Sequence, residues 1–108
     1  MTAKKKLGAR AARRQNDRDV QKFMRDRTRL AALEKGGAPD RPIQVTSASE
    51  VEISARSIPC IQCESIVRVD EHLAETIGAD RLRLARVTCP ACGTKRTIYY
   101  RIGLPLPN

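Results

Sequence analysis

The first half of the chain carries apolar residues at the spacing of an α-helix. Between residues 16 and 35 the larger ones fall within roughly 120° of a helical wheel, at about 100° per residue. They are Val20, Phe23, Met24, Leu30 and Ala31. Asn16, with an acidic residue three positions later, is typical of a helix start. Gly36 and Gly37 can supply a left-handed end. The pattern therefore predicts one amphipathic helix over residues 16–35.

The second half shows the shorter period of β-strands. Val51, Ile53 and Ala55 alternate with polar residues, which predicts a half-buried strand leading into the first cysteine pair. Asp70 is expected to cap a short helical turn that ends at Gly78. Three further strands are predicted, over residues 66–69, 81–88 and 96–102.

Three segments lack a sustained period. Residues 1–15 contain three Lys and three Arg but no acidic residue, and we expect this basic arm to be disordered when free. Residues 36–50 mix Gly, Pro, Ser and Thr and are interpreted as a flexible linker. Residues 105–108 are assigned as a tail, because the prolines at this end of the chain lack amide donors for a sheet.

The composition indicates that burial alone would leave this chain weakly stabilised. It has 108 residues, three of them aromatic, together with four cysteines. Small domains commonly add disulfides or a structural metal to such a thin core. No apolar run has the length of a membrane span, and the first twenty residues lack the apolar stretch of a secretory signal, so we expect a cytoplasmic protein. In that reducing compartment, paired cysteines favour metal ligands over disulfides.

The cysteines form two matched pairs. Cys60 and Cys63 are separated by two residues, as are Cys89 and Cys92, and 25 residues lie between the pairs. Two intervening residues let a tight turn direct both sulfurs at one ion, so the two turns together can form a tetrahedral four-thiolate shell. Gly93 can take the positive backbone angle needed after the last ligand, whereas the first turn has glutamate at that position.

These pairs resemble the zinc-ribbon superfamily, whose members hold one zinc ion between two such turns on a three-stranded sheet. The resemblance covers residues 51–104 and implies one structural Zn²⁺ bound by Cys60, Cys63, Cys89 and Cys92. The expected fold class is a small metal-stabilised α+β protein. It would combine a C-terminal antiparallel zinc ribbon with a basic N-terminal tail and one amphipathic helix. Function is not implied, because zinc ribbons serve in transcription factors, ribosomal proteins, polymerase subunits and enzyme accessory domains.

Other uses of the cysteines stay open. Iron bound by four thiolates has the same geometry as zinc, and redox dithiols would use the same residue type. A catalytic zinc keeps one position open for water, whereas four thiolates fill the shell. His72, the only histidine, is expected to be an ordinary surface residue. No nucleophile with its base, carboxylate pair or phosphate loop is evident, so we expect neither an enzyme nor a small-molecule substrate.

The charge is distributed unevenly. Residues 1–40 hold 12 Lys/Arg against 5 Asp/Glu, a net +7, whereas residues 41–108 hold 9 against 7, a net +2. Such asymmetry indicates a polyanionic partner. The candidate phosphate-binding residues cluster within eleven positions, where they could neutralise several phosphates together. They are Lys4, Lys5, Lys6, Arg10, Arg13 and Arg14.

The preferred functional hypothesis is a non-enzymatic protein that associates with nucleic acid or a nucleoprotein assembly through this basic arm. A related hypothesis is an accessory subunit of a ribonucleoprotein or polymerase complex. The alternative is a protein-interaction adaptor that docks through the helix at residues 16–35 and the ribbon. Tyr99 and Tyr100 must face opposite sides of a strand, so the exposed one could stack on a base. No membrane partner is expected.

Overall fold

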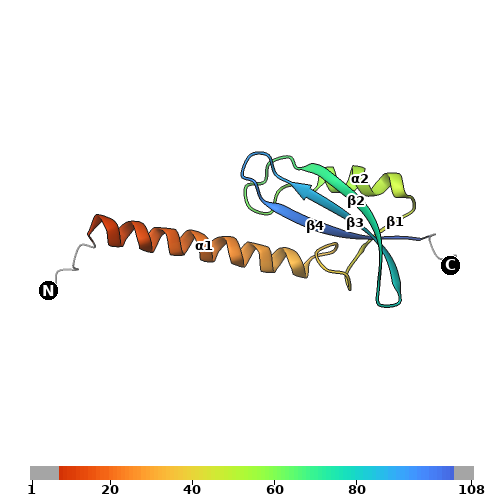
Figure 1. Ribbon diagram of the computed structural model, residues 1–108, viewed down its shortest axis with the longest axis horizontal. Coiled ribbons are helices and arrows are strands. Elements are labelled where there is room, and N and C mark those ends of the chain that lie inside the picture. The colour runs from red at the N-terminus through yellow and green to blue at the C-terminus, as the bar shows by residue number, and fades with distance from the viewer. Residues whose placement is uncertain (1–7, 104–108) are drawn as a thin grey trace.

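The chain forms one four-stranded sheet with two helices, seen in a computed structural model that describes residues 8–103 (Figure 1). This is a small α+β fold, as the sequence predicts. In chain order the elements are α1 (Ala9–Leu33), β1 (Ile43–Val45), α2 (Ala48–Ser57), β2 (Arg68–Ile77), β3 (Asp80–Thr88) and β4 (Lys95–Ile102).

The strands lie in the order β1-β4-β3-β2. The last three strands of the chain form an antiparallel meander, in which Ala85 of β3 faces Ile98 of β4 and His72 of β2. The short strand β1 adds to the far side of β4 in a parallel register. The sheet therefore has two edges, one formed by the three-residue β1 and the other by the ten-residue β2.

The core lies between the sheet and α2, which contacts all four strands and covers one face (Figure 1). Val51 and Ala55, one helical turn apart, are fully buried and belong to the same apolar cluster as Ile98 and Tyr100. The Tyr100 hydroxyl donates a hydrogen bond to Ser54 Oγ at 3.1 Å. Burying this ring against α2 contributes roughly 2–3 kcal/mol of apolar transfer free energy.

The segment 51–55 was predicted as a strand, and that prediction is wrong. Val51 and Ala55 satisfy the period of a strand and also the i, i+4 spacing of a helix, and the structure uses the second. Ile53, which the strand interpretation buries, is 62 % exposed. The predicted linker is also structured, because residues 36–50 include β1 and the start of α2.

The helical turn predicted after Asp70 is likewise absent, because this segment continues strand β2. The pairing of β2 with β3 shifts register between Val69 and Glu71, which leaves Asp70 in a bulge where it accepts a hydrogen bond from the Thr88 hydroxyl. Gly78, with φ of 62°, forms the hairpin turn between the strands. The predicted strands 81–88 and 96–102 are confirmed to within one residue.

Helix α1 begins at Ala9, seven residues before the predicted start. Residues 9–15 of the predicted disordered arm are therefore helical, while residues 1–7 and the predicted tail 105–108 lie outside the described residues. Alanine, arginine and glutamine are strong helix formers, and three alanines with three arginines fill this extension. Their propensity extends the helix past the capping signal at Asn16. The helix ends at Leu33, two residues before the predicted end.

The connection from α1 to β1 is closely packed rather than a flexible link. The Gly36 amide donates to the Arg41 carbonyl at 2.5 Å, and the Gly36 carbonyl accepts from the Tyr99 amide at 2.8 Å. Gly36 has φ of 83°, and a Cβ there would lie 2.7 Å from Ile43 Cδ1. A Cβ on Gly37 would lie 2.0 Å from the Ala31 carbonyl oxygen. Both glycines are thus required for the chain to turn under the sheet.

Candidate metal centre

The two cysteine turns have the same backbone hydrogen bonds. In the first turn, the Cys60 amide donates to the Ser65 carbonyl at 3.0 Å and the Glu64 amide donates to the Cys60 carbonyl at 2.9 Å. In the second, the equivalent bonds run from Cys89 to Thr94 at 2.9 Å and from Gly93 to Cys89 at 2.7 Å. Two segments far apart in the sequence therefore fold into one local shape.

Each turn also places one residue in the left-handed region directly after its second cysteine. Gly93 has φ of 79° and Glu64 has φ of 61°. The sequence predicts this conformation at Gly93, and at Glu64 it costs roughly 1–2 kcal/mol because of the Cβ of glutamate. Glu64 is the one non-glycine residue with positive φ among residues 8–103. Its conformation indicates that the shape of the first turn is imposed by the site.

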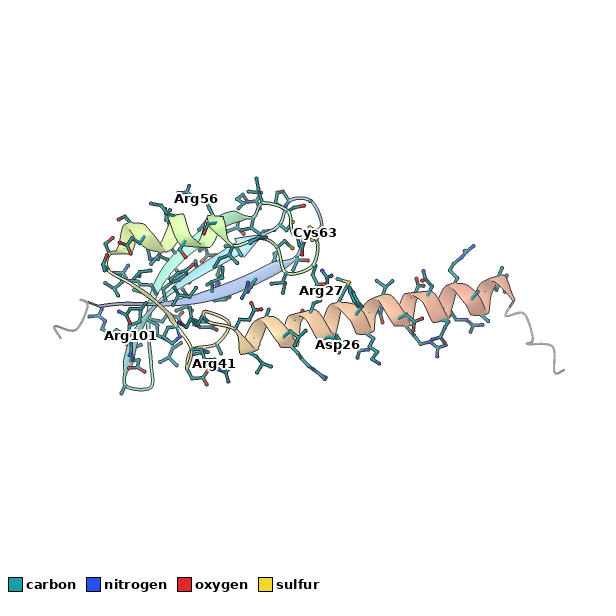
Figure 2. All side chains as sticks on the ribbon, turned by 180° about the vertical axis from the view of Figure 1, so that it is seen from behind. Asp26, Arg27, Arg41, Arg56, Cys63 and Arg101 are labelled. Atoms are coloured by element: carbon teal, nitrogen blue, oxygen red, sulfur yellow. The ribbon has the colours of Figure 1, made fainter. Side chains whose placement is uncertain are left out.

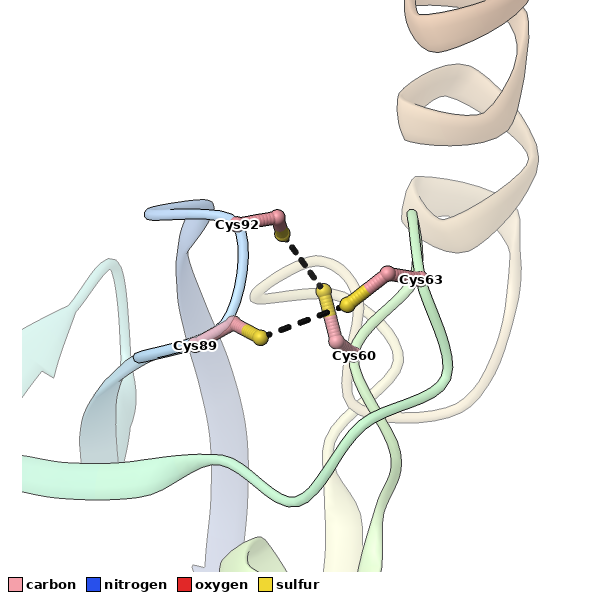
Figure 3. Close-up of side chains that lie close together, drawn as sticks. All are labelled: Cys60, Cys63, Cys89 and Cys92. Atoms are coloured by element: carbon pink, nitrogen blue, oxygen red, sulfur yellow. Dashed lines mark hydrogen bonds between the residues drawn. The ribbon is translucent and has the colours of Figure 1, made fainter.

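The four sulfurs converge on one point between the turns (Figure 3). All four Sγ atoms lie within 4.8 Å of one another, with Cys60 and Cys92 3.6 Å apart and Cys63 and Cys89 3.4 Å apart. A tetrahedral ion with metal–sulfur bonds of about 2.3 Å separates its sulfurs by about 3.8 Å. The four predicted ligands are therefore brought together in an arrangement that can hold a metal ion.

In each cysteine pair the first cysteine is buried in the core and the second is exposed to solvent. Cys60 and Cys89 are buried and belong to the apolar core cluster, whereas Cys63 and Cys92 are exposed. Cys89 directly follows β3, and β4 begins after the second turn. The site thus closes one end of the core and presents two of its ligands to solvent.

Polar groups around the sulfurs act on their ionisation. The hydroxyl and amide of Ser65 lower the pKa of the Cys63 thiol to about 6, while burial raises the pKa of Cys89 to about 11. The Gln62 amide donates to Cys60 Sγ at 3.4 Å, and the Thr94 hydroxyl lies 3.0 Å from Cys92 Sγ. The bond from the Gln62 amide favours the thiolate of Cys60. A bound cation would supply the charge that buried Cys89 needs for ionisation.

Helix α1 docks on the first cysteine turn, a contact that the sequence did not predict. The Gln62 side-chain amide donates to the Met24 carbonyl at 2.9 Å and to Thr28 Oγ1 at 3.2 Å. In return Arg27 donates to the Gln62 carbonyl at 2.6 Å, and Figure 2 shows Arg27 directed toward the turn that carries Cys63. The partners are 34 to 38 residues apart, and no local pattern identifies such a pair.

Of the candidate phosphate-binding residues, the structure describes the three arginines. Arg10, Arg13 and Arg14 are exposed in the first turns of α1, and Lys4, Lys5 and Lys6 fall outside the described residues. The metal-capable cluster found among residues 8–103 consists of the four cysteines.

His72 is not the surface residue predicted. Its side chain is 15 % exposed, with Nδ1 3.7 Å from a Glu52 carboxylate oxygen on α2. Tyr100 is buried and Tyr99 is half-buried, which confirms that the two rings face opposite sides of β4.

Comparison of the chain with protein-family models, curated proteins and solved structures finds no match in any of the three. The site is accordingly interpreted from its own geometry. Neither α1 nor α2, the helices of the described part, combines the length and apolar character needed to cross a membrane.

Proposed function

We propose that the cysteine cluster is the structural Zn²⁺ site of a zinc ribbon. The support is the duplicated turn, which aims four sulfurs at one point with the spacing that tetrahedral zinc requires. Four thiolates complete the shell and leave no position for water or substrate, so the ion stabilises the fold and does not itself catalyse a reaction. Elemental analysis after purification under reducing conditions should find about one zinc per chain. Iron in its place would make this a rubredoxin-like centre, and no metal would refute the site.

On this scaffold, we propose that the protein associates with nucleic acid or a nucleoprotein assembly through its basic N-terminal arm. The observation that supports this is the separation of charge from the metal site. Residues 1–40 carry a net +7, and Arg10, Arg13 and Arg14 are exposed on α1. Four ionised thiolates with one dication bring the +2 of residues 41–108 to about zero. A polyanion would therefore meet the N-terminal end first.

A salt titration tests this association. Affinity of the full chain for duplex DNA should fall steeply with salt, with a log-log slope of roughly −5 if six arm residues each neutralise one phosphate. Replacing Lys4, Lys5, Lys6, Arg10, Arg13 and Arg14 by alanine should remove most of that slope and leave zinc content unchanged, because none of the six is a cysteine ligand. Equal slopes for both proteins would exclude the arm as the binding surface.

A second candidate function, a protein-interaction adaptor, is favoured by one feature of α1. Phe23, Leu30 and Leu33 are 59 %, 62 % and 64 % exposed, more than a soluble helix needs. If the full chain binds no nucleic acid at any salt concentration, a protein partner at this apolar surface becomes the better explanation. Recovery of the same partners before and after nuclease treatment would support it.

A further inference from the structure

In helix α1 five arginines lie on one side of the helix and the acidic residues lie outside it, although the two kinds alternate along the sequence. At 3.6 residues per turn, five arginines fall within an arc of about 100° along its whole length. We call Arg10, Arg14, Arg18, Arg25 and Arg29 the basic stripe. Asp19 and Asp26 lie about 60° or more beyond one border of this arc, and Asp17 lies about 20° outside the other. No acidic residue therefore interrupts the stripe.

The basic stripe takes no part in the docking of α1. Contacts to the first cysteine turn come from Arg27 and the Met24 carbonyl, which lie outside the arc of the stripe, and from Thr28, which lies at its border beside Arg10. α1 packs against none of the other described helices or strands, and it projects from the sheet as a single rod (Figure 1). All five stripe arginines are exposed, and none of the ion pairs found among residues 8–103 involves them. The stripe therefore lies on a helix that is docked on the first cysteine turn, and its arginines are not neutralised by ion pairs within the described residues.

From this geometry we infer that the basic stripe is a rigid docking surface for the phosphate backbone of duplex DNA. The inference rests on the proposed function and deepens it, because it adds Arg18, Arg25 and Arg29 to the contact surface and selects the form of nucleic acid. From Arg10 to Arg29 the stripe spans about 28 Å at a rise of about 1.5 Å per residue. Duplex DNA carries about 16 phosphate charges over that length, at one per 1.7 Å.

A duplex fits the stripe better than a single strand does. Proteins that bind single strands combine positive charge with aromatic side chains on which bases stack. The stripe contains no aromatic residue. Phe23 lies on the opposite side of the helix, where the Cζ atom of Arg27 is 4.6 Å from the centroid of the Phe23 ring. A straight helix about 10–12 Å across also matches the major groove of B-form DNA, about 12 Å wide, whereas the A-form groove of duplex RNA is narrow.

An anionic membrane is a poorer partner. A helix that lies on a bilayer inserts its apolar side between the lipids. In α1 that side also carries Arg13 and Arg27, and its C-terminal part, where Ala31 is buried, is occupied by the first cysteine turn. Within α1, Val20 and Phe23 are the large apolar residues that precede this docked part. The docked turn therefore hinders insertion of this side of the helix between the lipids.

The test compares two double variants that remove the same charge. Arg25→Ala/Arg29→Ala removes two stripe arginines, neither of which belongs to the basic arm, and alanine preserves the helix. Lys35→Ala/Arg56→Ala is the matched control, since both side chains are exposed and lie off the stripe. Fluorescence anisotropy of a labelled duplex is measured for each protein over a series of salt concentrations. Zinc content and circular dichroism verify that every variant is folded.

The stripe variant should lose about 1.8 from the log-log salt slope, at about 0.9 per phosphate contact, while the control keeps the slope of the unmodified chain. Arg25→Lys/Arg29→Lys should restore most of the slope, because backbone contacts need charge rather than the planar guanidinium.

Three results would overturn the inference. Equal slopes for the stripe variant and its control would confine binding to the arm, leaving the proposed function intact. If a DNA single strand of the same length binds as tightly as the duplex or more tightly, duplex DNA is not the preferred ligand of the stripe. Binding to phosphatidylserine vesicles without binding to DNA would assign the stripe to a membrane. A full chain that binds neither DNA nor RNA would instead refute the proposed function itself.

Discussion

Helix α1 and the sheet body, by which we mean β1 to β4 with α2 and both cysteine turns, are stabilised in different ways. Twelve of the thirteen buried apolar residues belong to the sheet body, and α1 contributes only Ala31 over its 25 residues. The sheet body combines an apolar core with a metal site. α1 depends on helix propensity and a few hydrogen bonds to the first cysteine turn. From this difference we expect the sheet body to fold without α1, which projects from it and exposes most of its surface.

The largest expected effect comes from removing one metal ligand. Cys89→Ser should unfold the sheet body, because structural zinc contributes on the order of 10 kcal/mol or more to such folds, comparable to their whole stability. NMR spectroscopy should show collapsed amide dispersion and elemental analysis no metal. Chelation of the unmodified chain should give the same result. A well-dispersed spectrum of the metal-free variant would show that the apolar core is sufficient.

Replacing one aromatic side chain by alanine in the sheet body and one on α1 compares how tightly the two regions are packed. Tyr100→Ala should destabilise the protein by about 3–5 kcal/mol, because the ring is fully buried against α2. Phe23→Ala on α1 removes a ring that is 59 % exposed and should cost less than about 1 kcal/mol. Urea unfolding followed by circular dichroism compares the two. In Tyr100→Phe, loss of the hydrogen bond to Ser54 should cost about 1 kcal/mol. Similar costs for the two alanine variants would contradict the division into body and projection.

Gln62→Ala tests the contact between the two regions. It removes the hydrogen bonds from the Gln62 side chain to Met24 and Thr28, each contributing about 0.5–1.5 kcal/mol. Amide hydrogen exchange should accelerate in the second half of α1, while protection in β3 and β4 stays the same. Gln21→Ala, at an exposed position on the same helix, is the control and should change neither. Faster exchange throughout the sheet would mean that α1 belongs to the core.

The smallest effect concerns the two cysteine turns. Glu64→Gly should stabilise the protein by roughly 0.5–1 kcal/mol, because glycine adopts positive φ without the Cβ penalty. Gly93→Ala should destabilise it by a similar amount, although a Cβ there meets no atom within 4 Å. Thermal unfolding of the zinc-bound proteins resolves both. Loss of stability in Glu64→Gly would show that the Glu64 side chain makes a contribution beyond its backbone conformation.

The metal site is the part of this protein that the sequence by itself determined. Two residues between the cysteines of each pair specify a tight turn, so the ligand set follows from spacing, although positive φ is locally favourable only at Gly93 and not at Glu64. The strands at 81–88 and 96–102 were likewise set by local period. Over such short distances the chain has few alternatives.

Other elements were decided only by the tertiary structure. The alternation of Val51, Ile53 and Ala55 fits a strand, but those residues form a helix, because two of them can bury together on a sheet face that needs a cover. β1 is three residues long and exists because β4 offers unpaired backbone groups along one edge. The polar sequence of β2 has no strand period and is ordered by pairing with β3. In each case the deciding interactions join residues distant in the chain, and no local pattern contains them.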